Sequence, residues 1–118
     1  MQHKEHYLQK NCVEWFKNTY PEYANLYFSV PNGFKRTASQ SQWLNDEGMT
    51  KGVADTILLI PNKKYHCLLI EFKIKSGRQS PEQKEFQKNA TEKGYMYVIV
   101  KHTEDFKNVI GNYLSLTK

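Results

Sequence analysis

Long apolar stretches are absent from this chain, and cysteine is scarce. No apolar run approaches the length that spans a bilayer, so we expect no membrane segment. The N-terminus lacks the apolar core of a secretory signal. The two cysteines, Cys12 and Cys67, lie in apolar surroundings, and no Cys/His cluster has zinc-finger spacing. Two unpaired thiols fit a reducing, intracellular setting.

Acidic residues are also in the minority. The chain has 17 Lys and Arg against 12 Asp and Glu, which gives a net charge of +5 and a pI near 9.1. This balance favours a polyanionic partner such as nucleic acid, although ordinary solubility is the alternative explanation. A length of 118 residues suits one domain, residues 1–118, with no room for a separate recognition domain.

Apolar periodicity and turn residues predict alternating helices and strands. Ser80 and Pro81 begin a helix as N-cap and first helical residue, with Gln83 in the capping-box position. This order predicts an α/β sandwich in which helices flank a small mixed β-sheet, in the sequence αβ(α)ββαβα. The expected helices cover residues 4–18, 39–45, 81 to about 94, and 103–114, and the expected strands cover 26–30, 54–60, 65–74 and 95–100.

The chemistry is concentrated between residues 48 and 83. Glu71 and Lys73 are two residues apart in an apolar strand, so their side chains should point to the same face. Charges on such a strand are costly unless they pair with each other or hold a metal. Asp55 opens the preceding strand. Two acids and a lysine that converge at strand ends suit metal-dependent phosphodiester hydrolysis, whereas the alternative is a simple ion pair at a sheet edge.

A few oxygen ligands are enough for Mg²⁺, because this ion keeps several of its waters. Asp55 and Glu71 would supply carboxylates, and the Phe72 carbonyl would supply another oxygen. Lys73 would hold the attacking water or stabilise the negative charge that develops on the phosphate. The sequence therefore contains a candidate site for Mg²⁺ or Mn²⁺.

This pattern resembles the PD-(D/E)xK nuclease superfamily, and in particular its VRR-NUC (virus-type replication-repair nuclease) branch. The similarity runs in order along nearly the whole chain, although Ala54 stands where the family usually has proline. The matching motifs are E-x-x-x-Q (Glu5, Gln9), V-P-N-G (Val30 to Gly33), G-x-x-x-G-x-x-D (Gly48, Gly52, Asp55), E-x-K (Glu71, Lys73), S-P-x-Q (Ser80, Pro81, Gln83) and a closing strand from Gly94 to Val98.

The resemblance implies a restriction-endonuclease-like fold and a nuclease that depends on Mg²⁺ or Mn²⁺. It also implies that Glu5 reaches the metal site from the first helix and that Gln83 lies beside it. Glu14, on the same helix, is the rival to Glu5, and a solvated acid near the helix N-terminus is the alternative for Glu5. Gln83 could be a capping residue only. The implied catalytic residues are Glu5, Asp55, Glu71, Lys73 and Gln83, and the implied metal ligands are Glu5, Asp55, Glu71 and Phe72.

Basic residues surround these motifs and could neutralise DNA phosphates, unless they form only a solvated surface. Lys75 is expected on the same strand face as Lys73, and Trp43 could stack on a base. The candidate DNA-binding residues are Lys35, Arg36, Lys51, Lys75 and Arg78.

Single-domain relatives of this kind look like phage or bacterial proteins that form homodimers and cut branched DNA, such as four-way (Holliday) junctions. The resemblance thus implies work in the cytoplasm of a bacterium or a phage-infected host. A junction is two-fold symmetric, so two cuts require two copies of a small domain. The alternatives are a non-catalytic DNA-binding module on a nuclease fold, or a nuclease of different specificity: flap, nicking or restriction-type. The short chain argues against elaborate base readout.

Overall fold

A four-stranded mixed sheet forms the centre of the molecule in the computed structural model, which describes residues 3–31 and 37–117. The strands are β1 (Tyr27–Ser29), β2 (Thr56–Leu58), β3 (Leu68–Phe72) and β4 (Met96–Val100), in spatial order β1-β2-β3-β4. β1–β2 and β2–β3 are antiparallel, and β3–β4 is parallel. The predicted small mixed sheet is therefore confirmed.

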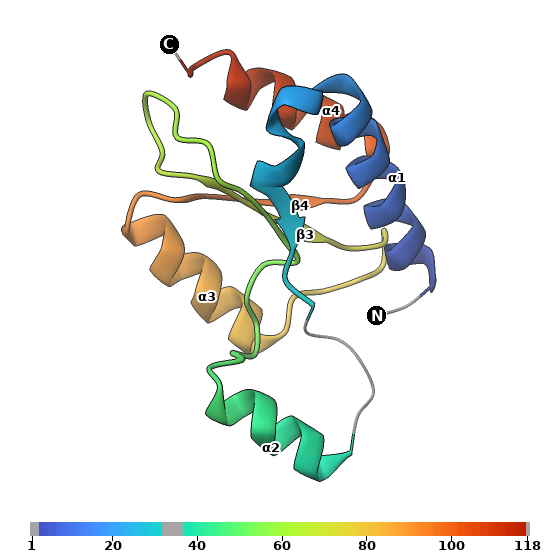
Figure 1. Ribbon diagram of the computed structural model, residues 1–118, viewed down its shortest axis with the longest axis vertical. Helices are drawn as coiled ribbons and strands as arrows, with labels where there is room; N and C mark the ends of the chain where they lie inside the picture. The colour runs from blue at the N-terminus through green and yellow to red at the C-terminus, as the bar shows by residue number, and fades with distance from the viewer. Residues whose placement is uncertain (1–2, 32–36, 118) are drawn as a thin grey trace.

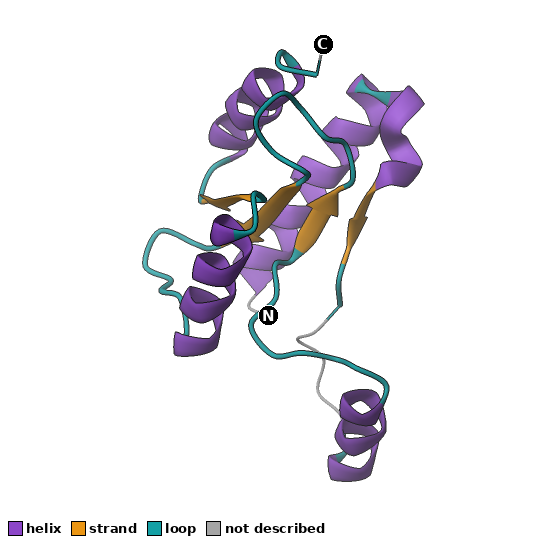
Figure 2. Ribbon diagram, turned by 90° about the vertical axis from the view of Figure 1, so that its left-hand side faces the viewer, coloured by secondary structure: helices purple, strands orange, loops and turns teal. Residues whose placement is uncertain are grey.

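Helices cover both faces of this sheet (Figures 1 and 2). α1 (His3–Thr19) and α4 (Thr103–Leu114) pack on one face, and α3 (Pro81–Glu92) packs on the other. A short 3-10 helix, η1 (Pro21–Leu26), joins α1 to β1 and was not predicted. α2 (Ala38–Asp46) stands apart from the layers in both views. In the described part of the chain, no helix is long and apolar enough to cross a membrane.

β3 is the central strand, and all five of its residues are buried. Its side chains alternate between the two faces. Leu68, Ile70 and Phe72 join the core beneath α1 and α4, whereas Leu69 packs in the smaller cluster beneath α3. Glu71 is on the same face as Leu69 and is 1% exposed. The sequence therefore places a carboxylate inside the layer between β3 and α3.

β2 and β3 are shorter than predicted. The loop that joins these antiparallel strands covers residues 59–67 and is longer than the expected strands 54–60 and 65–74 imply, because it is tied to the C-terminal part of the chain. The Lys63 N–H donates to the Leu116 carbonyl at 2.8 Å, and Asn62 Oδ1 accepts from the Lys64 and Tyr65 N–H groups. The extended backbone on either side of this loop therefore leaves the sheet ladder early.

The segment at residues 54–60 is not buried on both faces. Thr56 and Leu58 are buried on the α1–α4 face, but Leu59 is 49% exposed and Ile57 is only partly buried. α3 covers the β3–β4 half of the sheet, so this end of β2 is left uncovered on the α3 side.

Candidate active site

Asp55 is held at the junction of three strands. Its N–H donates to the Ile70 carbonyl at 3.0 Å, and its carbonyl accepts from the Val30 N–H at 2.8 Å. Its side-chain Oδ2 accepts from the Phe72 N–H at 2.7 Å. The carboxylate therefore lies at the end of β3, as the sequence predicted, and its position is set by backbone groups from both neighbouring segments.

The Asp55 carboxyl has a raised pKa. Burial raises it from 3.8 to about 6, and the Glu71 and Glu5 carboxylates add to the rise. The hydrogen bond from the Phe72 N–H and the charge of Lys73 act in the opposite direction. An acid whose ionised form is destabilised in this way gains from a nearby cation. A bound cation would therefore stabilise the ionised form of Asp55.

Glu71 and Lys73 face the same way, as their spacing predicted. Lys73 Nζ lies 3.7 Å from Glu71 Oε2, and both side chains are largely buried. Lys73 follows the last residue of β3, but its N–H donates to the Val100 carbonyl at 3.0 Å, which keeps it aligned with β4. Because β3 is central rather than an edge strand, the alternative of an exposed edge ion pair does not apply.

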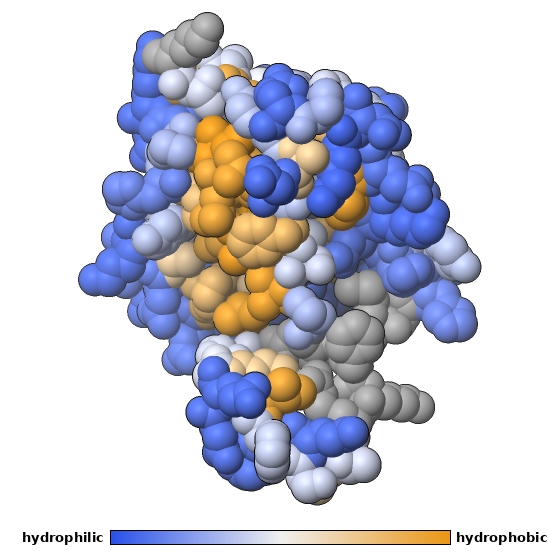
Figure 3. Space-filling model, in the orientation of Figure 1, coloured by the Kyte–Doolittle hydropathy of each residue, from blue (hydrophilic) through white to orange (hydrophobic). Residues whose placement is uncertain are grey.

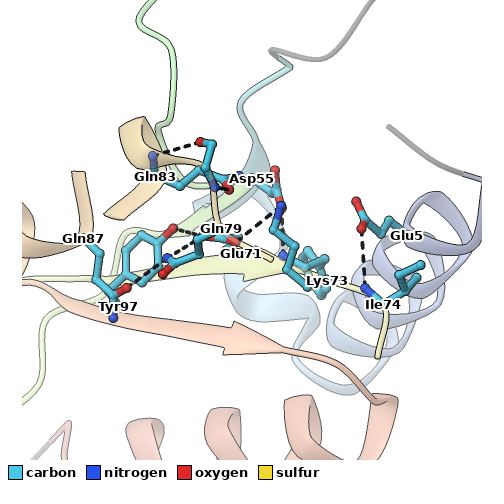
Figure 4. A network of polar contacts seen from close by, with 11 residues as sticks. Glu5, Asp55, Glu71, Lys73, Ile74, Gln79, Gln83, Gln87 and Tyr97 are labelled. Carbon is cyan, nitrogen blue, oxygen red and sulfur yellow. Dashed lines mark hydrogen bonds and ion pairs between the residues drawn. The ribbon is translucent and has the colours of Figure 1, made fainter. Parts of the chain in front are cut away.

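The first helix presents Glu5, not Glu14, to the end of β3. Glu5 Oε2 accepts a long hydrogen bond of 3.5 Å from the Ile74 N–H (Figure 4). Glu14 is exposed and pairs with Lys10 at 2.8 Å on its own helix. Both residues border an open groove, which is also lined by Gln9, Asp55, Phe72 and Lys73. The geometry therefore favours Glu5 as the acid from this helix.

Gln83 forms the predicted capping box at the start of α3. Its Oε1 accepts from the Ser80 N–H at 2.8 Å, and its own N–H donates to Ser80 Oγ at 3.1 Å. It also lines the same groove as Asp55. The capping role is thus confirmed, and the position beside the site is compatible with a second role.

Gly52 brings the Asp55 loop against the first turn of α3. Its φ is +88°, and a Cβ there would lie 2.5 Å from the backbone carbon of Glu82. Only glycine accepts both the left-handed backbone and this contact. The glycine three residues before Asp55 therefore serves chain geometry.

The three predicted acids do not form one metal-binding group. Within residues 3–31 and 37–117, no set of three or more His, Cys, Asp or Glu side chains is arranged to hold a metal ion. Asp55, Glu71 and the Phe72 carbonyl remain a donor set of the oxygen type that Mg²⁺ uses together with waters. Glu71 Oε2 is buried and has no hydrogen-bond partner. A bound cation would satisfy this oxygen. The residues at the end of β3 fit a divalent ion on this ground.

The candidate DNA-binding residues are distributed over loops. Lys35 and Arg36 lie outside the described residues. Lys51 is exposed and borders the groove. Lys75 is not on a strand face with Lys73, because β3 ends at Phe72 and the chain turns, with the Gly77 N–H donating to the Ile74 carbonyl. Lys75 and Arg78 are exposed on the loop that leads to α3.

The sequence analysis did not identify the residues that donate hydrogen bonds to the Glu71 carboxylate. Glu71 Oε1 accepts from the Tyr97 hydroxyl and, at 3.1 Å, from Gln79 Nε2 (Figure 4). Burial and the adjacent Glu71 raise the pKa of Tyr97, so its hydroxyl stays a protonated donor. The sequence predicts only that Tyr97 lies in the strand at residues 95–100. Its place in β4, paired with Leu69 of β3, becomes informative only once the parallel pairing is known.

The structure is an α/β domain whose central strand ends in a group formed by Asp55, Glu71 and Lys73. The sequence model of the VRR-NUC domain matches residues 2–103, so the chain belongs to the VRR-NUC family. A solved structure described as a VRR_NUC domain protein superimposes with a TM-score of 0.84, over 100% of this chain and 93% of that chain. At 23% sequence identity this likeness establishes the fold. A comparison with curated proteins gives no match. Family membership makes the chain a nuclease-type, DNA-processing domain.

Proposed function

We propose that residues 1–118 form one metal-dependent DNA endonuclease domain that hydrolyses phosphodiester bonds, selectively on branched DNA such as four-way junctions. One observation carries the proposal: Asp55, Glu71 and Lys73 meet at the end of β3, and a buried Glu71 oxygen there has no hydrogen-bond partner. Two free, buried thiols, Cys12 and Cys67, suit the reducing cytoplasm of a bacterium or phage-infected host.

Each residue has a role in this proposal. Asp55, Glu71 and the Phe72 carbonyl hold Mg²⁺ or Mn²⁺, and Glu5 faces the same groove as a further acid. When bound, the ion supplies Lewis-acid polarisation of the phosphate and a water of lowered pKa. Lys73 donates hydrogen bonds to the attacking water or to a phosphate oxygen that gains charge. Gln83 supports the site from α3, and Lys51 contacts backbone phosphates at the groove edge. Lys35, Arg36, Lys75 and Arg78 contribute further phosphate contacts.

Cleavage assays on several DNA forms test the activity and its selectivity. End-labelled four-way junction, flap and linear duplex are incubated with Mg²⁺ or Mn²⁺ and with wild-type protein or Lys73→Ala. We expect paired cuts near the junction for wild type and none for the variant. Equal cleavage of all substrates would remove the junction claim. DNA binding without cleavage on any substrate would instead favour a non-catalytic DNA-binding module.

A homodimer is part of the proposal, because one small domain has one site and a two-fold symmetric junction needs two cuts. An apolar surface on the α3 side of β1 and β2 supports it. Phe28 pairs with Ile57 in register, and the Leu59 N–H donates to the Leu26 carbonyl at 2.9 Å. Leu26, Phe28 and Leu59 are 36%, 39% and 49% exposed. Figure 3 shows apolar side chains gathered across the middle of one face of the molecule.

α2 offers the matching surface. This helix of nine residues contains no buried residue, and Trp43 is 72% exposed. A helix of this length is marginal without packing. Within the described residues, the apolar strand surface and α2 are both left largely uncovered. Two copies of the chain would cover them reciprocally, which is the self-complementary contact that a two-fold dimer requires.

Removing the apolar strand surface should separate the copies. We expect Leu26→Lys combined with Leu59→Lys to convert a dimer to a monomer in light-scattering mass measurements, because burying two charges at an interface is costly. The same variant should nick one strand of a junction where wild type makes paired cuts. Tyr7→Lys, which changes a more exposed aromatic residue on α1, should stay dimeric. A wild-type protein that is monomeric at all concentrations would refute the dimer.

A further inference from the structure

The two oxygens of the Glu71 carboxylate have unequal surroundings. Oε1 accepts from the Tyr97 hydroxyl of β4 and from Gln79 Nε2, which lies in the loop before α3. Oε2 is buried, has no hydrogen-bond partner and lies 3.7 Å from Lys73 Nζ. Buried carboxylate oxygens are normally hydrogen-bonded. The arrangement therefore leaves one oxygen unsatisfied on the side where Lys73 lies.

The donors on Oε1 determine which oxygen is left unsatisfied. The terminal torsion of a glutamate is broad and roughly two-fold, so packing alone restrains its carboxylate weakly. Two hydrogen bonds from separate elements, β4 and the loop before α3, remove that freedom. Turning the carboxylate away would leave the Tyr97 hydroxyl buried without an acceptor, which is costly.

Gln87 is a second acceptor for the Gln79 amide. Gln79 Nε2 donates to Gln87 Oε1 at 2.9 Å as well as to Glu71. An amide turned end for end would bring its oxygen against two other acceptors. Because the Glu71 carboxylate can only accept, a Gln79 nitrogen faces it, and Gln87 Oε1 supports this orientation by accepting from the same nitrogen (Figure 4).

We propose that Tyr97 and Gln79 are positioning residues, with Gln87 behind them, which lock Glu71 so that Oε2 is presented to the divalent ion and to Lys73. This inference rests on the proposed function, because it concerns how the same site binds its ion. None of the three residues needs to touch DNA or metal for this role. Residues of β4, α3 and the loop before α3 thereby influence metal binding through the orientation of the Glu71 carboxylate.

Calorimetric titration of metal-free protein with Mn²⁺ tests the proposal directly. Tyr97→Phe removes only the hydroxyl and keeps the ring that packs against Phe86, and Gln79→Met keeps the side-chain length. Each should weaken Mn²⁺ binding by about 10-fold, as loss of an outer hydrogen bond to a metal ligand does. Tyr113→Phe is the matched control, because its hydroxyl donates to the Ile60 carbonyl at 2.7 Å and its loss should leave Mn²⁺ affinity unchanged.

Two further readouts separate positioning from simple stabilisation. In protein carrying ¹³C in the glutamate carboxyl groups, the Glu71 signal, assigned by its loss in Glu71→Gln, should shift in metal-free Tyr97→Phe but not in Tyr113→Phe. In cleavage assays, Tyr97→Phe should lower kcat and leave KM for DNA unchanged. Unaltered Mn²⁺ affinity in both site variants would overturn the inference while the proposed function stood. A wild-type protein that neither binds Mn²⁺ nor cleaves DNA would overturn both.

Discussion

Replacement of Lys73 by methionine should abolish cleavage yet strengthen metal binding. Methionine keeps the length of the side chain and removes its charge, so the variant should fold. Loss of a group that orients water or stabilises developing charge costs about 10³-fold in kcat. The ammonium lies 3.7 Å from Glu71 Oε2 and therefore opposes a second cation at the same carboxylate. We expect tighter Mn²⁺ binding by calorimetry and no detectable DNA hydrolysis.

Lys107→Met is the control for this experiment. Lys107 lies on α4, where it is 3.6 Å from Glu104 and stacks over Trp15, so the variant loses one positive charge away from the site. It should cleave and bind Mn²⁺ as wild type does. If Lys73→Met retained cleavage, the assignment of Lys73 to the chemistry would be wrong. If its Mn²⁺ affinity fell, Lys73 would be supporting the ion rather than opposing it.

Asp55→Asn should stabilise the metal-free protein at neutral pH and remove its response to metal. Asparagine retains an oxygen that can accept from the Phe72 N–H, but it carries no charge. In wild type, burial holds the pKa of Asp55 at about 6 against 3.8 for the free side chain. The ionised form is therefore disfavoured in the folded state, and its removal should raise the free energy of unfolding by about 3 kcal/mol at pH 8.

The sign of the pH dependence follows from the raised pKa. Well below pH 3.8, Asp55 is protonated in both the folded and the unfolded state, and it imposes no penalty. As pH rises from 4 to above 6, the unfolded state loses its proton first, so wild type loses stability. The difference between Asp55→Asn and wild type should thus be small at pH 4 and fully developed above pH 7, as measured by urea unfolding in the presence of a chelator.

Added Mn²⁺ should make wild type more stable than Asp55→Asn at pH 8, which is the reverse of their order without metal. A ligand that binds only the folded state stabilises it, so wild type should gain thermal stability with metal, whereas Asp55→Asn should not. Glu14→Gln is a suitable control, since Glu14 is an exposed acid paired with Lys10, and its response to Mn²⁺ should match that of wild type. Equal metal-induced shifts in wild type and Asp55→Asn would exclude Asp55 as a ligand.

The order of helices and strands could be read from the sequence because their signals are local. The capping box at Ser80 and Gln83 and the mainly apolar run from Leu68 to Phe72 depend on neighbours a few residues away. The pairing of Glu71 with Lys73 follows from two-residue alternation on a strand. The predicted lengths of β2 and β3 were wrong. The loop between them, residues 59–67, is held by α4 and the C-terminal segment, which are distant in sequence.

The sequence by itself determined the residue types at the site, through the spacing of Asp55, Glu71 and Lys73, and it determined the family resemblance. Tertiary structure decided the rest. The packing of α1 places Glu5, rather than Glu14, at the end of β3. Lys75 lies beyond the end of the strand. Tertiary structure also set Tyr97 and Gln79 on one oxygen of Glu71. The physical reason is that backbone periodicity acts within a segment, whereas the direction of a buried charge depends on donors that only the packing of separate elements brings near.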